Sequence, residues 1–249
     1  MKVTFLGHSG FAVQAGSLLL IFDYETGELP LEDGIERLIF FVSHRHQDHF
    51  NPAIFYPEGW NGQTEYVLSK DVRKAIRRLE GVPEERCRWM AAGEELRLTS
   101  GDGADGREQR ERDGQSVRVR TLRSTDCGVA FLVSLEEGQI YHAGDLNCWT
   151  WPEDTKQHRN QMVAEYQREI RRLQGEQIRL AFCPLDPRLE ENYADGFLWF
   201  LEHVDADYVW PMHMWEEYGT ADRLLATMEN EALKKKVMRI SRAGQQWEI

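Results

Sequence analysis

The sequence has no apolar run long enough to cross a membrane. Its longest apolar runs, Ser17–Phe22 and Leu38–Val42, have the length of β-strands, whereas a membrane-spanning helix needs about 20 apolar residues. The first apolar run of the chain is broken at residues 7–9, which distinguishes it from a secretion signal. We therefore expect a cytoplasmic protein with no membrane segment.

The sequence also lacks cysteine pairs and an excess of positive charge. The four cysteines are scattered and form no C-x-x-C pair, which favours reduced thiols. The chain carries 30 basic and 42 acidic residues, and its formal net charge of −12 repels phosphate backbones at long range. The charge argues against nucleic-acid binding, and we expect a small-molecule substrate.

The chain does contain enough hydrophobic residues for a sizeable core, 41% of its 249 residues. We expect a single domain over residues 1–249. Apolar runs bounded by glycines and other turn residues predict short strands. These strands are Lys2–Leu6, Phe11–Ala15, Leu18–Asp23, Leu38–Val42, Glu94–Leu98, Val117–Leu122, Gly128–Ser134, Gln139–His142, Ile178–Cys183 and Asp207–Trp210, with Val237–Ser241 and Gln246–Ile249 closing the tail.

Apolar residues at helical spacing predict helices in the same chain. The candidate helices are Asp71–Leu79, Lys156–Leu173, Phe197–His203 and Asp222–Glu229. Residues 100–116 contain four glycines and no large apolar residue, so we expect a polar, mobile excursion from a hairpin there. The order of strands and helices favours a layered α/β domain with the sheets in the middle.

Four potential metal ligands lie within six residues, directly after a strand that is predicted to be buried. In an extended chain residues i and i+2 point to the same side, so His44 and His46 can hold one cation. After a turn, the side chains of Asp48 and His49 can reach a second position near the first cation. Neutral imidazoles and carboxylates are ligands of Zn²⁺ and related ions. The spacing favours a metal site over the alternative, a histidine-rich surface turn.

Two further candidate ligands follow later predicted strands. Asp145 ends the segment Tyr141–Asp145, and His213 ends the segment Val209–His213. The ends of strands are where an α/β scaffold presents its reactive groups. Each residue alone is typical of a turn aspartate or a core histidine, but beside the first motif both indicate ligands that complete a cluster.

These motifs together resemble the metallo-β-lactamase superfamily of metal-dependent hydrolases. The pattern H-x-H-x-D-H, the later Gly-Asp and the final His carry the resemblance, which extends from Phe5 to His213. The segments FLGHSGFAVQ and YHAGDL are similar to the compact, lactonase-like branch of that superfamily. The resemblance implies a four-layer αββα sandwich of the α/β (α+β) class, with metals bound at one edge where the two sheets meet.

The resemblance also implies a ligand set for two metal ions. We expect zinc, with Mn²⁺ or Fe²⁺ as alternatives. By motif, the first ion is bound by His44 and His46, the second by Asp48, His49 and His213, and Asp145 bridges the two.

One element departs from the superfamily pattern. The superfamily usually supplies a third histidine to the first ion from a loop between these motifs. The corresponding residues 122–128 contain no histidine. We expect Asp126 to replace it through a carboxylate oxygen, with the thiolate of Cys127 as the alternative. If neither residue reaches the ion, the protein holds a single metal.

The implied mechanism is hydrolysis by a metal-bound hydroxide. Two close cations lower the pKa of a shared water toward ~7, and the resulting hydroxide attacks a carbonyl carbon or a phosphorus. Asp48 can orient that hydroxide, and His8 or His142 can protonate the leaving group. The expected substrate is a small ester, lactone or phosphoester. The alternatives are a nuclease of the same superfamily and a non-catalytic metal-binding or sensing protein.

Other residues near these motifs have two possible roles each. The tryptophans after Asp145 and His213 can form an apolar wall for a substrate or belong to the core. Arg188 can hold an anionic group or pair with Asp186. Asp23 is either a carboxylate that orients a ligand histidine or an ordinary turn residue.

Overall fold

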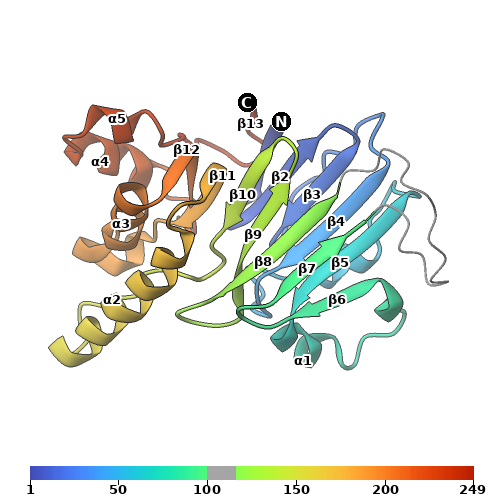
Figure 1. The fold of residues 1–249 in the computed structure, drawn as a ribbon, viewed down its shortest axis with the longest axis horizontal. Coiled ribbons are helices and arrows are strands. Elements are labelled where there is room, and N and C mark those ends of the chain that lie inside the picture. Colours follow the sequence, from blue (N-terminus) through green and yellow to red (C-terminus); the bar gives the residue numbers. More distant parts are fainter. Residues whose placement is uncertain (100–115) are drawn as a thin grey trace.

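The protein is described by a computed structural model that covers residues 1–99 and 116–249. The excursion expected over residues 100–116 lies, apart from Ser116, outside these described residues. In the described part the chain forms two β-sheets flanked by helices (Figure 1). The two chain ends lie side by side, since the amino group of Met1 donates a hydrogen bond to the carbonyl oxygen of Ile249 at 2.9 Å.

The first sheet contains the strand that leads into the histidine-rich motif. Its described strands have the order β13-β1-β2-β3-β4-β5-β6, and those from β3 to β6 are parallel. Every residue of β4 is buried, as expected for a parallel strand that is covered on both faces. The bounds are β1 Lys2–Gly7, β2 Gly10–Ala15, β3 Leu18–Phe22, β4 Arg37–Val42, β5 Gln63–Ser69, β6 Cys87–Met90 and β13 Gln246–Glu248.

The second sheet contains the strands that lead to Asp145 and His213. Its described strands have the order β12-β11-β10-β9-β8-β7. Strands β10, β11 and β12 are parallel, so their carboxyl ends meet at one edge of the sheet. The bounds are β7 Glu95–Leu98, β8 Val117–Arg123, β9 Val129–Leu135, β10 Gly138–His142, β11 Gln177–Pro184 and β12 Asp205–Met212.

Aromatic pairs join the two sheets face to face. Phe11 of the first sheet stacks on Phe182 of the second, with ring centroids 4.2 Å apart. Phe41 meets Phe131 edge-on at 5.4 Å. All four rings are buried, and burying such a side chain contributes about 1.5–3 kcal/mol. This packing fixes the two sheets relative to each other, and with them the loops at their common edge.

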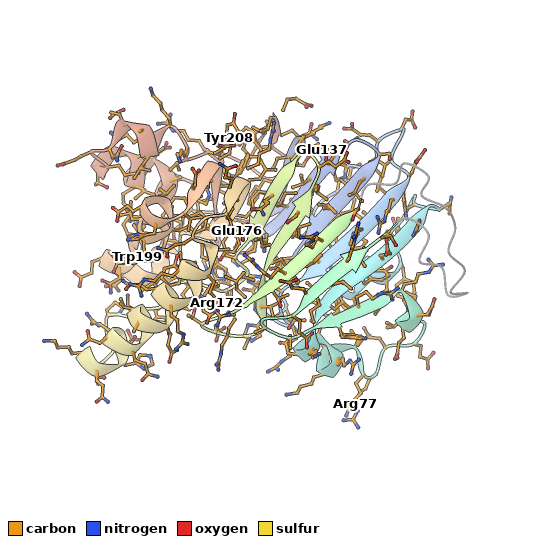
Figure 2. The ribbon with its side chains drawn as sticks, in the orientation of Figure 1. Arg77, Glu137, Arg172, Glu176, Trp199 and Tyr208 are labelled. Carbon is orange, nitrogen blue, oxygen red and sulfur yellow. The ribbon has the colours of Figure 1, made fainter. Side chains whose placement is uncertain are left out.

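The α-helices that follow β10 in the chain lie beside the second sheet, near β11 and β12 (Figure 1). They are α2 Lys156–Ile170, α3 Asp195–His203, α4 Gly219–Thr227 and α5 Glu231–Lys234. Tyr141 of β10 stacks on Phe200 of α3 at 5.3 Å. Trp199 of α3, labelled in Figure 2, stacks on His203 at 3.6 Å. Among the described residues, no helix is both long and apolar enough to cross a membrane.

The outer face of the first sheet is covered more thinly than the resemblance implies. A second apolar cluster lies there, and α1 (Arg73–Ile76) contributes only four residues to its cover. Phe55, from a short 3₁₀ turn, packs on Tyr66 at 5.0 Å. The two central sheets are as predicted, but loops and short turns provide much of this outer layer.

Most predicted strands form within two residues of their expected bounds. The helix predicted over Asp71–Leu79 is reduced to α1 and a preceding 3₁₀ turn, Lys70–Val72. The tail segment Val237–Ser241 forms a single bridge to Val209 in place of a strand. Strands β5 and β6 were not predicted.

Candidate metal centre

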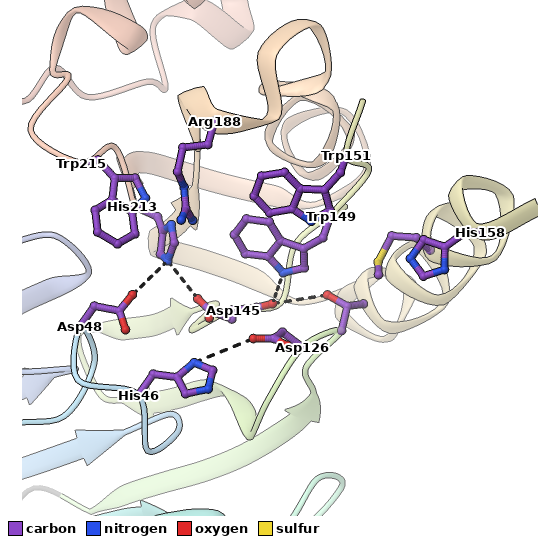
Figure 3. A pocket seen from close by; sticks show the side chains of 12 residues that line it. His46, Asp48, Asp126, Asp145, Trp149, Trp151, His158, Arg188, His213 and Trp215 are labelled. Atoms are coloured by element: carbon purple, nitrogen blue, oxygen red, sulfur yellow. Dashed lines mark hydrogen bonds and ion pairs between the residues drawn. The ribbon is translucent and has the colours of Figure 1, made fainter. Parts of the chain in front are cut away.

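Loops at one edge of the two sheets bring the predicted ligands together (Figure 3). The histidine-rich motif follows β4, Asp145 follows β10 and His213 directly follows β12. The side chains of His44, His49 and His213 are no more than 3% exposed. The seven predicted ligands, which come from four separate segments of the chain, therefore meet at one edge of the sheets.

The inner cluster consists of Asp48, His49, His213 and Asp145. Oδ1 of Asp145 lies 3.1 Å from Nε2 of His49 and 3.5 Å from Nε2 of His213. Oδ2 of Asp48 lies 3.7 Å from each of these nitrogens. Four potential ligand atoms therefore surround a common space.

The outer cluster consists of His44, His46 and Asp126, and it shares Asp145. Nε2 of His44 lies 3.0 Å from Nδ1 of His46 and 3.2 Å from Oδ2 of Asp145. Oδ2 of Asp126 lies 4.0 Å from Nδ1 of His46. Asp145 thus presents one oxygen to each cluster, which is the arrangement of a carboxylate that bridges two ions.

These separations fit the dimensions of a metal site. For a tetrahedral ion with bonds of about 2.1 Å, neighbouring ligand atoms lie about 3.4 Å apart. The inner cluster spans 3.1 to 3.7 Å. In the outer cluster the contact of Asp126 with His46 is longer, at 4.0 Å.

Unpartnered buried atoms provide an independent test of this fit. Nε2 of His49, Nε2 of His213 and Oδ1 of Asp145 are buried and make no hydrogen bond. A buried polar atom without a hydrogen bond costs about 1–3 kcal/mol, and here ion-pair contacts of 3.1 to 3.7 Å made by these groups offset part of that cost. All three line the inner cluster, where a divalent cation would satisfy them together. The residues present therefore fit a bound metal.

Asp23 forms a hydrogen bond with the ring nitrogen of His49 that faces away from the cluster. Nδ1 of His49 donates a hydrogen bond to Oδ2 of Asp23 at 2.7 Å, which leaves Nε2 free for the cluster. The same carboxylate accepts hydrogen bonds from the backbone and hydroxyl of Ser43, at 2.7 and 2.6 Å. Of the two alternatives, the geometry favours a carboxylate that orients a ligand.

The electrostatics of the inner cluster favour a positive charge. Burial alone would lower the pKa of His49, but the charges of Asp145 and Asp23 raise it well above its usual value. Burial alone would raise the pKa of Asp145, but His49, His44 and His213 hold it well below its usual range. A cation at this position would interact favourably with the same carboxylates.

Asp186 supports His213 in the same way. Nδ1 of His213 donates to Oδ2 of Asp186 at 2.8 Å. Nε of Arg188 donates to both oxygens of Asp186, each at 3.0 Å. Burial alone would raise the pKa of Asp186, but these hydrogen bonds hold it well below its usual range. Arg188 is thus paired, and its partner carboxylate fixes the orientation of a candidate ligand.

Replacing Asp186 with asparagine is expected to weaken metal binding by about 10- to 100-fold, because carboxylates that orient ligand histidines typically have effects of this size. Competition with a coloured chelator measures the change. The matched control is Asp207→Asn, at an exposed position of the strand that precedes His213. Equal affinities in the two variants would contradict the role of Asp186.

Several residues at the clusters have a left-handed backbone. The φ angles are +42° for Asp23, +44° for His8, +64° for His213 and +51° for Trp215. For residues other than glycine this conformation costs on the order of 1–3 kcal/mol, and it persists where the surrounding packing demands it. Its concentration around the clusters is typical of a functional site.

A glycine allows the Asp126 loop to approach the histidine motif. Gly128 has a φ of +69°, and a Cβ atom there would lie 1.9 Å from the carbonyl oxygen of Ser43. The next residue, Val129, donates a backbone hydrogen bond to the same oxygen at 3.0 Å. This close contact positions Asp126 beside the outer cluster.

Both candidate replacements for the missing third histidine lie near the outer cluster. Ligand atoms of Asp126, Cys127 and His46 lie within 4.8 Å of one another. Burial and the neighbouring charge of Asp126 raise the pKa of the Cys127 thiol, which disfavours the thiolate. The carboxylate of Asp126 is therefore the better ligand of the two.

The structure separates the three residues predicted to act in catalysis. Asp48 lines the pocket described below. His8 lies beside Asp48, with its Nε2 3.3 Å from Oδ2 of that aspartate. His142 is fully buried, with Nε2 donating to the carbonyl oxygen of Ser9 at 2.9 Å and Nδ1 accepting from the backbone of Gly144 at 3.1 Å. Because both nitrogens are engaged in the core, the placement of His142 argues against the predicted proton-donor role, and we do not propose it further.

A cavity of about 370 Å³ opens over the two clusters. Its walls include Trp149, Trp151 and Trp215, from the loops after β10 and β12 (Figure 3). Trp149 is fixed by a hydrogen bond from Nε1 to the carbonyl oxygen of Asp145 at 2.8 Å. The tryptophans therefore line the pocket beside the ligands.

Other parts of the pocket wall were not expected from the sequence. Met162 and His158 reach it from α2. The guanidinium of Arg188 lies over Trp215 at 4.3 Å and near Trp151 at 5.6 Å. Only the packing of α2 against the loop after β10 brings Met162 and His158 to the site, so no local signal could have identified them.

Comparison with known proteins agrees with this fold. No protein-family model matches the chain. The chain is 25% identical over 159 residues to a UPF0173 metal-dependent hydrolase of Pyrobaculum islandicum, a match that covers 60% of this chain and 63% of the relative. A protein of the same name from Pyrobaculum calidifontis matches at 25% over 156 residues, covering 58% and 61%. The chain thus spans less than two thirds of the length of these relatives.

Solved structures share the fold at low sequence identity. Igni18, a metallo hydrolase from Ignicoccus hospitalis, has a TM-score of 0.62 at 16% identity and is covered over 98% of its length by the whole of this chain. YhfI of Bacillus subtilis, a metallo-β-lactamase fold protein, has a TM-score of 0.51 at 14% identity, with 99% of both chains covered. CmlA, a diiron β-hydroxylase from Streptomyces venezuelae, has a TM-score of 0.53 at 14% identity over 87% of this chain and 45% of its own.

These comparisons confirm the predicted resemblance. The chain has the metallo-β-lactamase fold, with two central mixed sheets. The relatives matched in sequence are named metal-dependent hydrolases. One neighbour in fold is a diiron protein, so the fold alone does not specify zinc.

Proposed function

We propose that this protein is a metal-dependent hydrolase that acts on a small ester, lactone or phosphoester. The observation that carries the proposal is the convergence of unpartnered buried atoms of His49, His213 and Asp145 beneath an open pocket. The relatives named metal-dependent hydrolases support it. A protein that only stores or senses a metal has no need of a substrate-sized cavity over its ligands.

We propose that His44, His46 and Asp126 hold one ion and that Asp48, His49 and His213 hold another, with Asp145 between them. Divalent ions in such a pair lower the pKa of a water molecule toward ~7 and polarise the substrate. Zinc is the expected metal, with Mn²⁺ or Fe²⁺ as alternatives. Both candidate clusters use imidazole and carboxylate, a donor set that suits each of these ions.

The chain's own residues position the reacting groups. Asp48 is half-buried at the floor of the pocket, where its carboxylate can accept a hydrogen bond from an attacking water and orient it. Burial alone would raise the pKa of Asp48, but His8 and His49 hold it well below its usual range. The three indole walls exclude water from the side of the pocket and bind the apolar part of a substrate.

Metal removal and reloading tests the proposal. Protein stripped with a chelator and reloaded with Zn²⁺, Mn²⁺ or Fe²⁺ is assayed against simple esters, lactones and phosphodiesters. We expect turnover of at least one class, lost on stripping and restored by one of the ions. In His46→Ala this turnover should be lost without unfolding, whereas the control His203→Ala, on α3 outside the pocket, should retain it. Metal binding without turnover of any class would instead favour the sensing protein.

A further inference from the structure

We propose that His8 is an additional protein ligand of the inner metal, so that this ion is bound by three histidines. The proposal rests on the metal centre described above. His8 lies far from the other ligands in the sequence, in the turn between β1 and β2. Its role was expected to be proton donation, and the contacts of its side chain argue for ligation instead.

The side chain of His8 is directed into the protein. It is only 8% exposed, and its Nε2 is buried without a hydrogen-bond partner. The same condition applies to Nε2 of His49 and Nε2 of His213, the nitrogens of the inner cluster. Three imidazole nitrogens in one small volume therefore face carboxylate oxygens at 3.1 to 3.7 Å without making a hydrogen bond, and one cation would satisfy all three.

The distances place His8 within the inner cluster. Its Nε2 lies 3.3 Å from Oδ2 of Asp48, closer than the nitrogens of His49 and His213, which both lie at 3.7 Å. These values bracket the ligand separation of about 3.4 Å expected around one ion. The potential ligand atoms of all four residues lie within 4.8 Å of one another.

The backbone holds His8 in this position. The carbonyl oxygen of His8 accepts a hydrogen bond from the backbone of His213 at 3.2 Å, which ties the turn to the loop that carries another ligand. The φ of His8 is +44°, a conformation that is uncommon outside glycine and asparagine. The imidazole of His8 packs on that of His213 with ring centroids 4.3 Å apart.

The position of His8 also argues against proton donation to a leaving group. Trp215 meets the His8 ring edge-on at 4.6 Å, and Trp215 lines the pocket whereas His8 does not. A proton donor must reach the substrate directly or through one water. His8 instead faces the floor of the cluster, where a metal would bind.

Ligation by His8 would give the two ions different surroundings. The inner ion would have three imidazoles, with Asp48 and the shared Asp145. The outer ion would have two imidazoles, with Asp126 and the shared Asp145. The histidine that is missing from the outer site would thus be matched by an additional histidine at the inner site.

The test uses His8→Asn, because asparagine tolerates a positive φ, with His8→Ala as a second variant. Metal affinity is measured by chelator competition, and the Co²⁺-loaded proteins are compared by visible absorption, which intensifies as the coordination number falls. The control is His203→Ala, on α3 outside the pocket, where the imidazole contacts Trp199. Circular dichroism of the metal-free proteins establishes that the variants fold.

We expect both His8 variants to bind the inner ion at least ~10-fold more weakly and to show a changed Co²⁺ spectrum, with the control unchanged. Unchanged affinity and spectrum in His8→Asn, with slower turnover, would overturn ligation and favour the proton donor. Failure of this inference alone leaves metal binding by the wild-type protein intact. If the wild-type protein binds no divalent ion, the proposed hydrolase function fails as well, so metal binding by the wild type distinguishes the two failures.

Discussion

Replacing Asp145 with asparagine is expected to empty at least one metal position and to lower turnover about a thousandfold. Asp145 presents Oδ1 to His49 and His213 and Oδ2 to His44, at 3.1 to 3.5 Å. The substitution removes the only negative charge that the two clusters share. A metal contributes several kcal/mol to transition-state stabilisation, and about 4 kcal/mol corresponds to the expected thousandfold loss.

The measurement combines elemental analysis after dialysis with steady-state kinetics on the best substrate found. Asp222→Asn is the matched control, since this aspartate is exposed on α4 and pairs with Arg239 at the surface. We expect the control to keep both its metal content and its rate. An Asp145→Asn protein that retains two ions and full turnover would disprove the bridging role.

The sequence could indicate the candidate ligands because their signals are local. The run of residues 38–42 and the motif after it are contiguous, so a buried strand followed by a histidine-rich turn is evident without any tertiary contact. Asp145 and His213 were found by the same rule, because each follows an apolar strand. Parallel pairing then brings strand ends to one edge, which physical principles already imply.

The elements that were missed depend on distant partners. Strand β5 contains Glu65, which looks unsuited to a buried strand, but Glu65 accepts a hydrogen bond from Arg37 of the neighbouring β4 at 2.6 Å. The helix predicted over residues 71–79 had suitable spacing, but it buries only Val72 and Ile76. Most helical stability comes from packing, so this segment keeps a single short helix.

The supporting residues of the site show the same limit. From the sequence, Asp23 had two possible roles, and Asp186 was considered only as a partner of Arg188. Their hydrogen bonds to His49 and His213 span 26 and 27 residues of sequence, and no local pattern specifies such pairs. The sequence also assigned His8 and His142 the same expected role. Only tertiary packing decides that His8 faces the cluster and His142 faces the core.

The outer ion is expected to bind more weakly than the inner ion, and Asp126→Ala is expected to remove it selectively. The side chains of His46 and Asp126 are 42% and 48% exposed, whereas those of His49 and His213 are at most 3% exposed and are each oriented by a buried carboxylate. Exposed ligands retain more freedom and lose more entropy on binding.

Metal titration of the wild-type protein should therefore show two steps. In Asp126→Ala the weaker step should shift by at least ~100-fold while the tighter step is kept, since the inner ligands remain intact. Cys127→Ser, which removes the alternative ligand, should leave both steps unchanged.

Asp126→His provides the opposite change. It restores a nitrogen ligand at the place where the superfamily usually has one, and the resemblance implies that the weaker step should tighten. Loss of both ions in Asp126→Ala would show that the two positions bind cooperatively, which contradicts separate sites. A two-step titration in Asp126→Ala identical to that of the wild type would instead exclude Asp126 as a ligand.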